Sequence, residues 1–562
     1  MVIGNVTQKI RNVKRLRQIS HIFVKYGFGY IVDRLNIDQN LVGRKIIKIA
    51  SAKKLDVFDI PIPVRIRKMM EELGPAFIKL GQVLSTRPDL IPLEFCQELE
   101  KLQNEVPAFA YEKAKEQIEN ELKEPIDKLF SSFSVDSFAA ASLSQVYMAE
   151  SKSGEKLVVK VQRPDIEKTI RADLDILYTL AQLAEKYIEE IRLYNPTVVV
   201  DEFKKTILRE IDFSLEAKNI DRFRRNFKDD NTVYIFKVMH HLSTKKILTM
   251  ERLEGIKASN VNEIGRIGLD KRQIAINGAD AILKQIFMHG FFHADPHPGN
   301  IFVLKDGRIA FLDFGMVGRI DAETREQISG ILVAIIHRDT KGIIETFVSM
   351  GAVEKDTGVK KLNLDLTDFV ENYYEIPLKD LRMDQFLPDL INIISHNRIK
   401  VPADFFLLSK ALITIESVGK KMSPDFNAVS QAKPFVERLV KERYSTKNIV
   451  RGVKGFLKGL YILTNLLPRD LTIILNKIKK GTLRVEFEHR GLENLIHVLD
   501  KVSNRVAFSL VIAALIVGSS IIMQADKGPI LFDFPVLGVI GFVAAGIMGL
   551  WLAIAILRSG RL

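Results

Sequence analysis

The sequence is very poor in cysteine. Its 562 residues include a single one, Cys96. A disulfide within the chain is therefore excluded, and so is a zinc site built from several cysteine thiolates. A reducing compartment is consistent with this composition.

Residues 1–32 lack the two features of a secretory signal, because they contain neither a seven-residue apolar run nor a small-residue cleavage site. They also lack acidic residues, which leaves a mitochondrial presequence open, although their low serine content argues against one. We therefore expect no secretory signal.

The overall composition is that of a globular protein, with 47% hydrophobic and 27% charged residues. The length predicts two or more domains, since domains usually have about 100–200 residues. The net charge of +13 favours anionic partners such as phosphate ligands, anionic lipid or nucleic acid. Nucleic acid is the weakest of these, because no nucleic-acid-binding motif or aromatic platform accompanies the charge.

The N-terminal region is strongly basic, since residues 1–54 contain twelve Lys or Arg against two Asp. Apolar residues recur between them at helical spacing: Ile10, Val13, Leu16, Ile19 and Phe23. This pattern is typical of a basic amphipathic helix on an anionic membrane surface. A solvated helix that packs its apolar side on the main domain fits equally well, and both interpretations stay open.

Two neighbouring stretches carry the groups of a phosphoryl-transfer site. In Phe291–Asn300, Asp295 precedes Asn300 by five residues, and Ile309–Met316 is an apolar strand that leads into Asp313. Kinase-type sites use one carboxylate to orient or deprotonate a nucleophile, and an amide and a second carboxylate to hold Mg²⁺ on ATP phosphates.

His293 and His297 have the i, i+4 spacing of a helical metal pair. Pro296 and Pro298 oppose a regular helix at this position, so a structural role in the loop is favoured over a zinc site.

Residues 131–160 have strand character, residues 165–225 read as helical, and a further strand is expected around Ile247–Met250. Ser144–Ala149, Leu157–Val161 and Ile247–Met250 each read as strands, and Glu251–Gly255 reads as a hinge. Lys160 is a single cation within an apolar strand. It either meets an anionic partner, such as a nucleotide phosphate with a helix glutamate, or reaches solvent at the strand end.

Residues 61–130 and 272–290 read as helical. Pro75 is suited to the first position of a helix. Gly81 within that helix costs about 1 kcal/mol relative to alanine and predicts a close neighbour. Gly278, on the apolar face of the second region, would allow a close neighbour.

The C-terminal region predicts two membrane-spanning helices. Val506–Met523 and Phe534–Leu557 contain no charge over 18 and 24 residues, close to the ~20 needed to cross a bilayer. Basic residues precede and follow the pair and occur throughout 445–490, which predicts a cytoplasmic position for both ends. Gly541, Ala545 and Gly549 would form a helix-packing face. A buried hairpin of a soluble protein is the alternative.

The chain resembles the UbiB family, also called the ADCK family, of atypical kinase-like proteins. Six motifs carry the resemblance and occur in the family's order. They are the KxGQ motif Lys79–Gln82 within Phe77–Leu90, the alanine-rich stretch Ala139–Ser142, the lysine strand Val158–Pro164, the ExD motif Glu210–Asp212, the catalytic-loop counterpart His293–Asn300 and the metal-binding counterpart Leu312–Gly315. The resemblance covers roughly residues 60–440 and the hairpin found in bacterial members.

The resemblance implies roles for particular residues. Asp295 and Lys79 are the implied catalytic residues, and Lys79 is expected to turn into the site to meet Glu210 or Asp212 as a regulatory ion pair. Asn300 and Asp313 are the implied Mg²⁺ ligands. The implied ATP-binding residues are Ala139, Ala140, Ala141, Ser142, Lys160 and its expected ion-pair partner Glu216.

The predicted fold is α+β: an atypical protein-kinase-like bilobal fold with extra N-terminal helices and a C-terminal two-helix transmembrane hairpin. The predicted regions are a basic amphipathic N-terminal region over residues 1–60, a helical KxGQ extension over 61–130, an N-lobe over 131–255, a C-lobe over 256–440, a basic juxtamembrane region over 441–500 and the hairpin over 501–562.

By resemblance, the function is that of a membrane-anchored ATPase or small-molecule kinase that uses ATP and Mg²⁺ and supports isoprenoid quinone biosynthesis at a bacterial cell membrane. The implied partners are anionic lipids and a hydrophobic quinone precursor or quinone-biosynthesis enzymes, and homodimerisation stays open. A nucleotide-gated scaffold without catalysis is the alternative. A conventional protein kinase is disfavoured, because no Ala-Pro-Glu tripeptide follows Asp313 to form a peptide platform.

Overall fold

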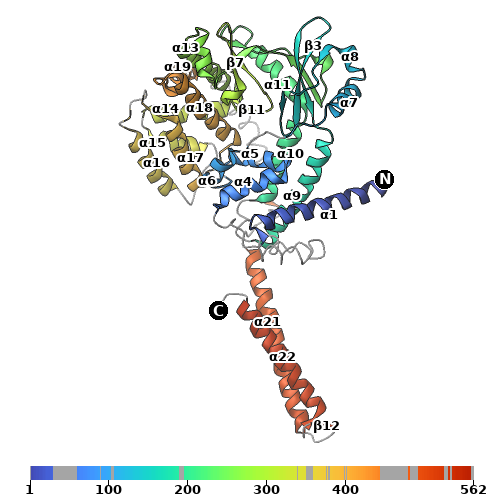
Figure 1. The fold of residues 1–562 in the computed structure, drawn as a ribbon. Helices are drawn as coiled ribbons and strands as arrows, with labels where there is room; N and C mark the ends of the chain where they lie inside the picture. The colour runs from blue at the N-terminus through green and yellow to red at the C-terminus, as the bar shows by residue number, and fades with distance from the viewer. Residues whose placement is uncertain are drawn as a thin grey trace. The chain divides into compact units, whose positions relative to one another are not determined.

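The computed structural model describes residues 2–29, 60–88, 90–102, 107–188, 195–337, 339–349, 359–374, 376, 380–397, 399, 401–443, 479–480, 492–524, 529–531 and 534–558. The chain divides into two compact units, Met1–Val450 and Arg451–Leu562 (Figure 1). Most of the basic stretch predicted at 445–490, and residues 30–59 of the N-terminal region, lie outside the described residues.

The N-lobe of the first unit is built on a five-stranded antiparallel sheet. Its order is β1-β3-β4-β6, with β2 paired to β3. The strands are β1 (Phe130–Phe133), β2 (Ala139–Ala140), β3 (Ser144–Ser151), β4 (Lys156–Gln162) and β6 (Ile247–Glu251). The three strands predicted from sequence lie within β3, β4 and β6, and are confirmed.

Buried and less buried side chains alternate along β4, and this alternation shows which face of the sheet carries Lys160. Leu157, Val159 and Val161 are fully buried in a core shared with α7 (Tyr111–Leu122). Because successive strand residues point to opposite faces, Lys160 lies on the other face.

The C-lobe combines a small sheet with a layer of helices. The sheet order is β5-β10-β9-β7, and a separate antiparallel pair joins β8 to β11. These strands are β5 (Val233–Tyr234), β7 (Gly255–Lys257), β8 (Phe291–His293), β9 (Ile301–Leu304), β10 (Ile309–Phe311) and β11 (Val317–Arg319). The helices are α12 (Val261–Arg266), α13 (Lys271–Leu283), α14 (Ala322–His337), α15 (Thr340–Ser349), α16 (Val359–Tyr374), α17 (Met383–His396), α18 (Ala403–Met422) and α19 (Ala428–Arg443).

The predicted helix at 272–290 is present as two segments, since α13 is continued by a π-helical turn, Lys284–Met288. Gly278 would allow a close neighbour, but a Cβ there would meet no atom within 4 Å. Gly278 therefore lies at a position with open space rather than in a tight helix contact.

A third group of helices packs beside the two lobes. It contains α1 (Val2–Lys25), α4 (Ile62–Leu73), α5 (Pro75–Ser85), α6 (Leu93–Leu99), α9 (Ile166–Tyr187) and α10 (Pro196–Glu210). The short α8 (Ile126–Leu129) belongs to the N-lobe, where it leads into β1. In Figure 1, α4, α5 and α6 lie beneath both lobes. Helix α5 begins at Pro75, as predicted, and a Cβ at Gly81 would overlap the side chains of Leu102 and Met70. The predicted close approach at Gly81 is thus confirmed.

Helix α1 packs on this group through its apolar side. Ile19 and Ile22 are buried in the core that α4, α5, α9 and α10 share. Arg15 binds Asp173 of α9 at 2.7 Å and donates to the backbone oxygen of Leu73 at 2.6 Å. The packing interpretation therefore holds for this segment of the N-terminal region, and membrane binding by residues 1–54 stays a prediction.

The second unit contains the hairpin of α21 (Leu492–Met523) and α22 (Val536–Arg558), closed by the strands β12 (Ile530–Leu531) and β13 (Phe534–Pro535). Val502–Met523 and Val536–Ile554 are long and apolar enough to cross a membrane. Side chains such as Leu510 are largely exposed (71%). Two of the three predicted packing positions face a neighbour: a Cβ at Gly541 would overlap Ser519, and Ala545 is buried, whereas Gly549 is open.

Candidate nucleotide-binding active site

Strand pairing brings the predicted catalytic and metal residues to one edge of the C-lobe. Asp295 and Asn300 follow β8, and Asp313 follows β10, whose Phe311 pairs with Ile301 of β9. Leu312 donates its backbone N–H to the carbonyl of Asn300 at 2.8 Å, which fixes the two loops side by side. Asp295, Asn300 and Asp313 line one cavity of about 650 Å³.

His293 links the loop that carries Asp295 to the loop that carries Asp313. Its ring is fully buried, Nδ1 accepts from the backbone N–H of Asp295 at 3.2 Å, and Nε2 lies 2.9 Å from the carbonyl oxygen of Leu312. Burial lowers the pKa of His293, so the neutral ring with its proton on Nε2 fits both bonds.

The metal-pair alternative for His293 and His297 finds no support in the geometry. The Nδ1 atom of His297 accepts from Gly299 at 3.2 Å within its own turn. Within the described stretches of the chain, no group of three or more His, Cys, Asp or Glu could hold a metal ion by itself.

The oxygen atoms of Asn300 and Asp313 suit a hard cation that also binds phosphates. The side-chain amide N–H of Asn300 donates to the carbonyl of Asp295 at 3.2 Å. This bond does not use the side-chain oxygen of Asn300, which stays available for a cation. Asp313 has a left-handed backbone (φ 53°), which few residues other than Gly, Asn and Asp adopt. Its carboxyl group is 57% exposed toward the cavity. Lys160 holds the pKa of Asp313 well below its usual value.

Lys160 meets an acidic partner, as one of the two sequence interpretations proposed. Its ammonium lies 3.0 and 2.9 Å from the two carboxylate oxygens of Glu216, on α11 (Phe213–Asn226), and 3.5 Å from Asp313. Burial opposes the charge on Lys160, but Asp313 and Glu216 outweigh it and raise the pKa of Lys160. Burial raises the pKa of Glu216 against the attraction of Lys160.

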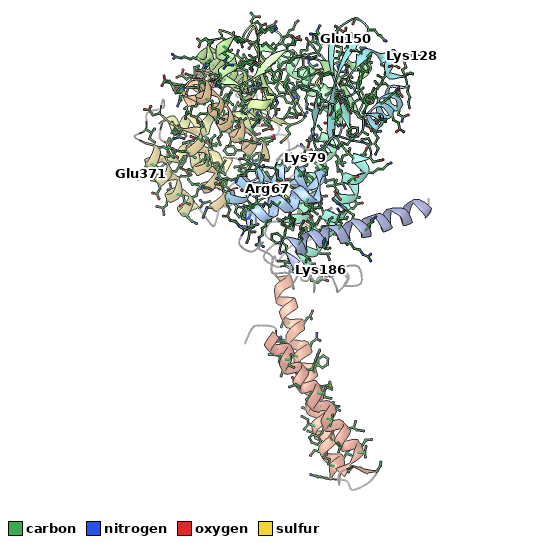
Figure 2. The ribbon with its side chains drawn as sticks, viewed as in Figure 1. Arg67, Lys79, Lys128, Glu150, Lys186 and Glu371 are labelled. Atoms are coloured by element: carbon green, nitrogen blue, oxygen red, sulfur yellow. The ribbon has the colours of Figure 1, made fainter. Side chains whose placement is uncertain are left out.

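Lys79 extends from α5 and pairs with Glu210 at the end of α10. Figure 2 labels Lys79, which lies on the side of α4 and α5 nearest the two lobes. Asp212 has a different role in the structure: it caps α11, accepting from the backbone N–H of Ser214 at 3.0 Å. Of the two predicted partners, only Glu210 therefore forms the ion pair with Lys79. Lys79 and Glu210 both line the 650 Å³ cavity.

The alanine-rich stretch lies against the sheet and does not line that cavity. Ala139 and Ala140 form β2, paired with Val146 and Gln145 of β3. Ala141 donates to Ser144 at 2.8 Å and accepts from Arg163 at 3.0 Å, and Ser142 is buried. Pairing with β3 thus holds Ala139–Ser142 in a turn close to Lys160, since Val146 pairs with both Ala139 and Lys160.

Sequence reasoning missed a cation beside Asp295. Lys410 of α18 places its ammonium 3.3 Å from the Asp295 carboxylate, and it lines the 650 Å³ cavity. One feature of the sequence could have identified Lys410: it is the single charged residue in the run Phe405–Ile415. The residues of α18 around it are core residues, so this isolated lysine needed an acidic partner.

Comparison with known proteins identifies the family of the chain. The model of the ABC1 atypical kinase-like domain matches residues 101–347, that of the UbiB helical domain matches 366–427, and that of the ABC1/UbiB kinase-like C-terminal domain matches 490–558. A probable protein kinase UbiB of Marinobacter nauticus is 34% identical over 84% of this chain and 87% of its own. The chain belongs to the UbiB family.

Other relatives extend the similarity. The UbiB of Pseudomonas putida strain GB-1, also named a probable protein kinase, is 36% identical over 72% of this chain and 76% of its own. An uncharacterised protein from the hydrogenase 1 5′ region of Clostridium pasteurianum is 32% identical over 98% of this chain and all of its own. A solved structure of Rv3197 with erythromycin from Mycobacterium tuberculosis is similar over 73% of this chain, with 22% identity and a TM-score of 0.44.

UbiB membership confirms the family resemblance, and with it the α+β kinase-like fold followed by an apolar helical pair. It also assigns α18, which carries Lys410, to the UbiB helical domain.

Proposed function

We propose that this UbiB-family protein is a membrane-anchored atypical kinase or ATPase that binds Mg-ATP and supports isoprenoid quinone biosynthesis. The observation that carries this proposal is the clustering of Lys160, paired to Glu216, with Asp313, next to a cavity that Asp295, Asn300 and Asp313 line. This is the set of groups that phosphoryl transfer requires, brought together from both lobes.

The donor set fits Mg²⁺. Magnesium takes oxygen ligands and usually binds through one or two carboxylates together with substrate phosphates. Asp313 and Asn300 would supply the carboxylate and amide oxygens. The ammonium of Lys160 lies 3.5 Å from Asp313, which lines the 650 Å³ cavity. We therefore expect this ammonium to face the phosphates of a nucleotide bound there. Bound magnesium would neutralise charge on the phosphates.

Asp295 would orient the attacking hydroxyl or water. Its carboxylate is partly exposed to the cavity (35%), and its backbone N–H is fixed by His293. A carboxylate held in this way accepts a hydrogen bond from the nucleophile and can receive its proton.

The membrane anchoring in this proposal rests on the hairpin. Its two helices are of spanning length and expose large apolar side chains. Basic residues flank the pair, which favours a cytoplasmic position for the large unit. Anionic lipids would be partners there, and the quinone role and its hydrophobic precursor follow from the family resemblance.

Phosphate release tests the proposal directly. Purified protein in anionic liposomes should release phosphate from Mg-ATP, and Asp313→Asn should abolish the release. Asp306→Asn is the matched control, because Asp306 lies in the β9–β10 turn and binds Arg308 at the surface, away from the residues that line the cavity. Equal turnover in Asp313→Asn and the wild type would refute catalysis at this site.

The scaffold alternative makes the opposite prediction in cells. If nucleotide binding alone suffices, a strain carrying only Asp295→Asn should keep normal quinone levels, whereas catalysis requires that these levels fall and prenylated precursors accumulate.

A further inference from the structure

A second cavity, of about 610 Å³, adjoins the nucleotide cavity. It lies between α5–α6 on one side and α17–α18 on the other. The two cavities share Ser85, Glu100, Asp295, His297 and Lys410 in their linings. Asp295 and Lys410 therefore stand where the two spaces meet, with the metal-binding oxygens on one side of them only.

The walls of this second cavity are mostly apolar away from Asp295. Cys96 of α6, Ile391 of α17, and Phe406 and Val418 of α18 line it and are themselves buried. The volume falls within the ~300–1,000 Å³ of pockets that enclose small molecules. These walls suit the apolar body of a small ligand.

The charges of the lining do not suit an anion. Three carboxylates, Glu100, Asp295 and Asp384, line the cavity against two lysines, Lys410 and Lys421. Asp295 would repel an anionic head but accept a hydrogen bond from a neutral hydroxyl.

We propose that this cavity is the acceptor site and takes an amphipathic alcohol, with its hydroxyl at Asp295 and its apolar body between α6 and α18. The proposal rests on the proposed function, because it names the acceptor for the same Asp295. The alcohol oxygen forms a bond to the γ-phosphorus of ATP while the bond from that phosphorus to the bridging oxygen breaks. The hydroxyl proton passes to Asp295 and then to water, and the products are a phosphate monoester and ADP.

Photo-crosslinking locates the alcohol without depending on turnover. The probe is 4-[3-(trifluoromethyl)diazirin-3-yl]benzyl alcohol, bound to the full chain in liposomes, irradiated and mapped by peptide mass spectrometry. Adducts are expected on α6, α17 and α18 and should be displaced by geraniol. Adducts confined to other segments, such as the apolar helices α21 and α22, overturn the proposal.

Product analysis tests the transfer. With Mg-ATP and geraniol, the wild type should form geranyl phosphate. Ser417→Trp, which places a large ring in the cavity from an exposed position on α18, should lower both product and crosslinking by about tenfold or more. Gln385→Trp is the control, because Gln385 is exposed on α17 but is not among the lining residues.

The outcomes separate the two proposals. If no phosphate is released from ATP under any condition, the proposed function fails, whatever the crosslinks show. If ATP turnover is intact but geraniol gives no phosphate ester, or Ser417→Trp and Gln385→Trp respond alike, the acceptor site is wrong and the proposed function stands.

Discussion

The cations of the site come from two different kinds of element. Lys160 belongs to β4, which is paired on both sides: Lys160 lies opposite Val146 of β3 and Leu248 of β6. Lys79 and Lys410 belong to α5 and α18, outside the N-lobe sheet, and pair with Glu210 and Asp295. The position of Lys160 is therefore set by backbone hydrogen bonds on two edges, and those of the other two by side-chain packing.

The N-lobe therefore positions one lysine of the site by itself, whereas the other two lysines depend on helices outside the N-lobe sheet. The sheet and α11 hold the Lys160–Glu216 ion pair, which we propose faces the nucleotide phosphates. The two helix-borne lysines pair with Glu210 and Asp295, and all four residues line the 650 Å³ cavity. Substitutions at the three lysines should then differ in kind: loss of nucleotide chemistry at Lys160, loss of stability at Lys79, and slower transfer at Lys410.

The largest effect is expected for Lys160→Met. It removes the ammonium that is proposed to face the phosphates and leaves Glu216 buried without its cation. Phosphate release should therefore fall by about 100-fold or more. Lys156→Met is the matched control on the same strand, because Lys156 pairs with Glu254 at the surface. Steady-state ATPase assays of both variants check this, and similar activities would contradict the role of Lys160.

Lys79→Met should mainly destabilise the first unit. Lys79 and Glu210 are mostly buried (11% and 19% exposed), so removal of the lysine leaves a carboxylate with poor solvation. The expected cost is about 2 kcal/mol, below the ~3–5 kcal/mol of a fully buried pair. Urea unfolding should show that adding Glu210→Gln to Lys79→Met restores some of the loss. A double variant less stable than Lys79→Met would show that the pair is not what Lys79 stabilises.

Several site residues could be predicted from the sequence, because they lie in short segments that are close together along the chain. Asp295, Asn300 and Asp313 lie in the loops that follow or precede the short strands β8, β9 and β10. The pairing of β9 with β10 places Asn300 beside Asp313, and the amide of Asn300 binds the carbonyl of Asp295. Lys160 is identifiable as a lone cation in an apolar strand, although its partner can be chosen only through the family resemblance.

The rest depends on packing between distant segments. Lys410 is far from Asp295 in sequence, and its helix resembles any apolar core helix, so its partner cannot be inferred. The position of Asp212 beside Glu210 suggests an ion-pair residue, whereas its place before α11 makes it a cap. The π-helical turn after α13 escapes prediction because one extra residue barely changes the apolar spacing.

Lys410→Met should slow phosphoryl transfer by about tenfold, roughly 1.4 kcal/mol, through kcat rather than the KM for ATP. Its ammonium touches Asp295 but none of the predicted metal ligands. Lys410→Arg should keep most of the activity, since it preserves the charge. Lys433→Met on α19, an exposed position, serves as the control. A change in KM alone would assign Lys410 to nucleotide binding instead.

The smallest effect is expected at an ion pair away from the cavity. Asp230 binds Lys284 of the π-helical turn at 2.6 Å. Burial opposes its charge, but Lys284 and Thr232 hold the pKa of Asp230 below its usual value. A lowered folded-state pKa stabilises the protein above the unfolded value of about 3.9, and this stability is lost as the pH falls below it. Asp230→Asn should therefore be less stable than the wild type at neutral pH and converge with it in acid, as chemical unfolding at several pH values would reveal.

The origin of Lys410 on α18 also affects how the protein is made. A ribosome synthesises Asp295 and Asp313 well before it reaches residue 410. At about 5–20 residues per second, the delay is on the order of ten seconds. During that interval the nascent chain carries its carboxylates without the ammonium that joins Asp295 in the finished molecule. A chain released early, before α18, would lack this pair, one wall of the 610 Å³ cavity and the Lys410 side chain of the 650 Å³ cavity.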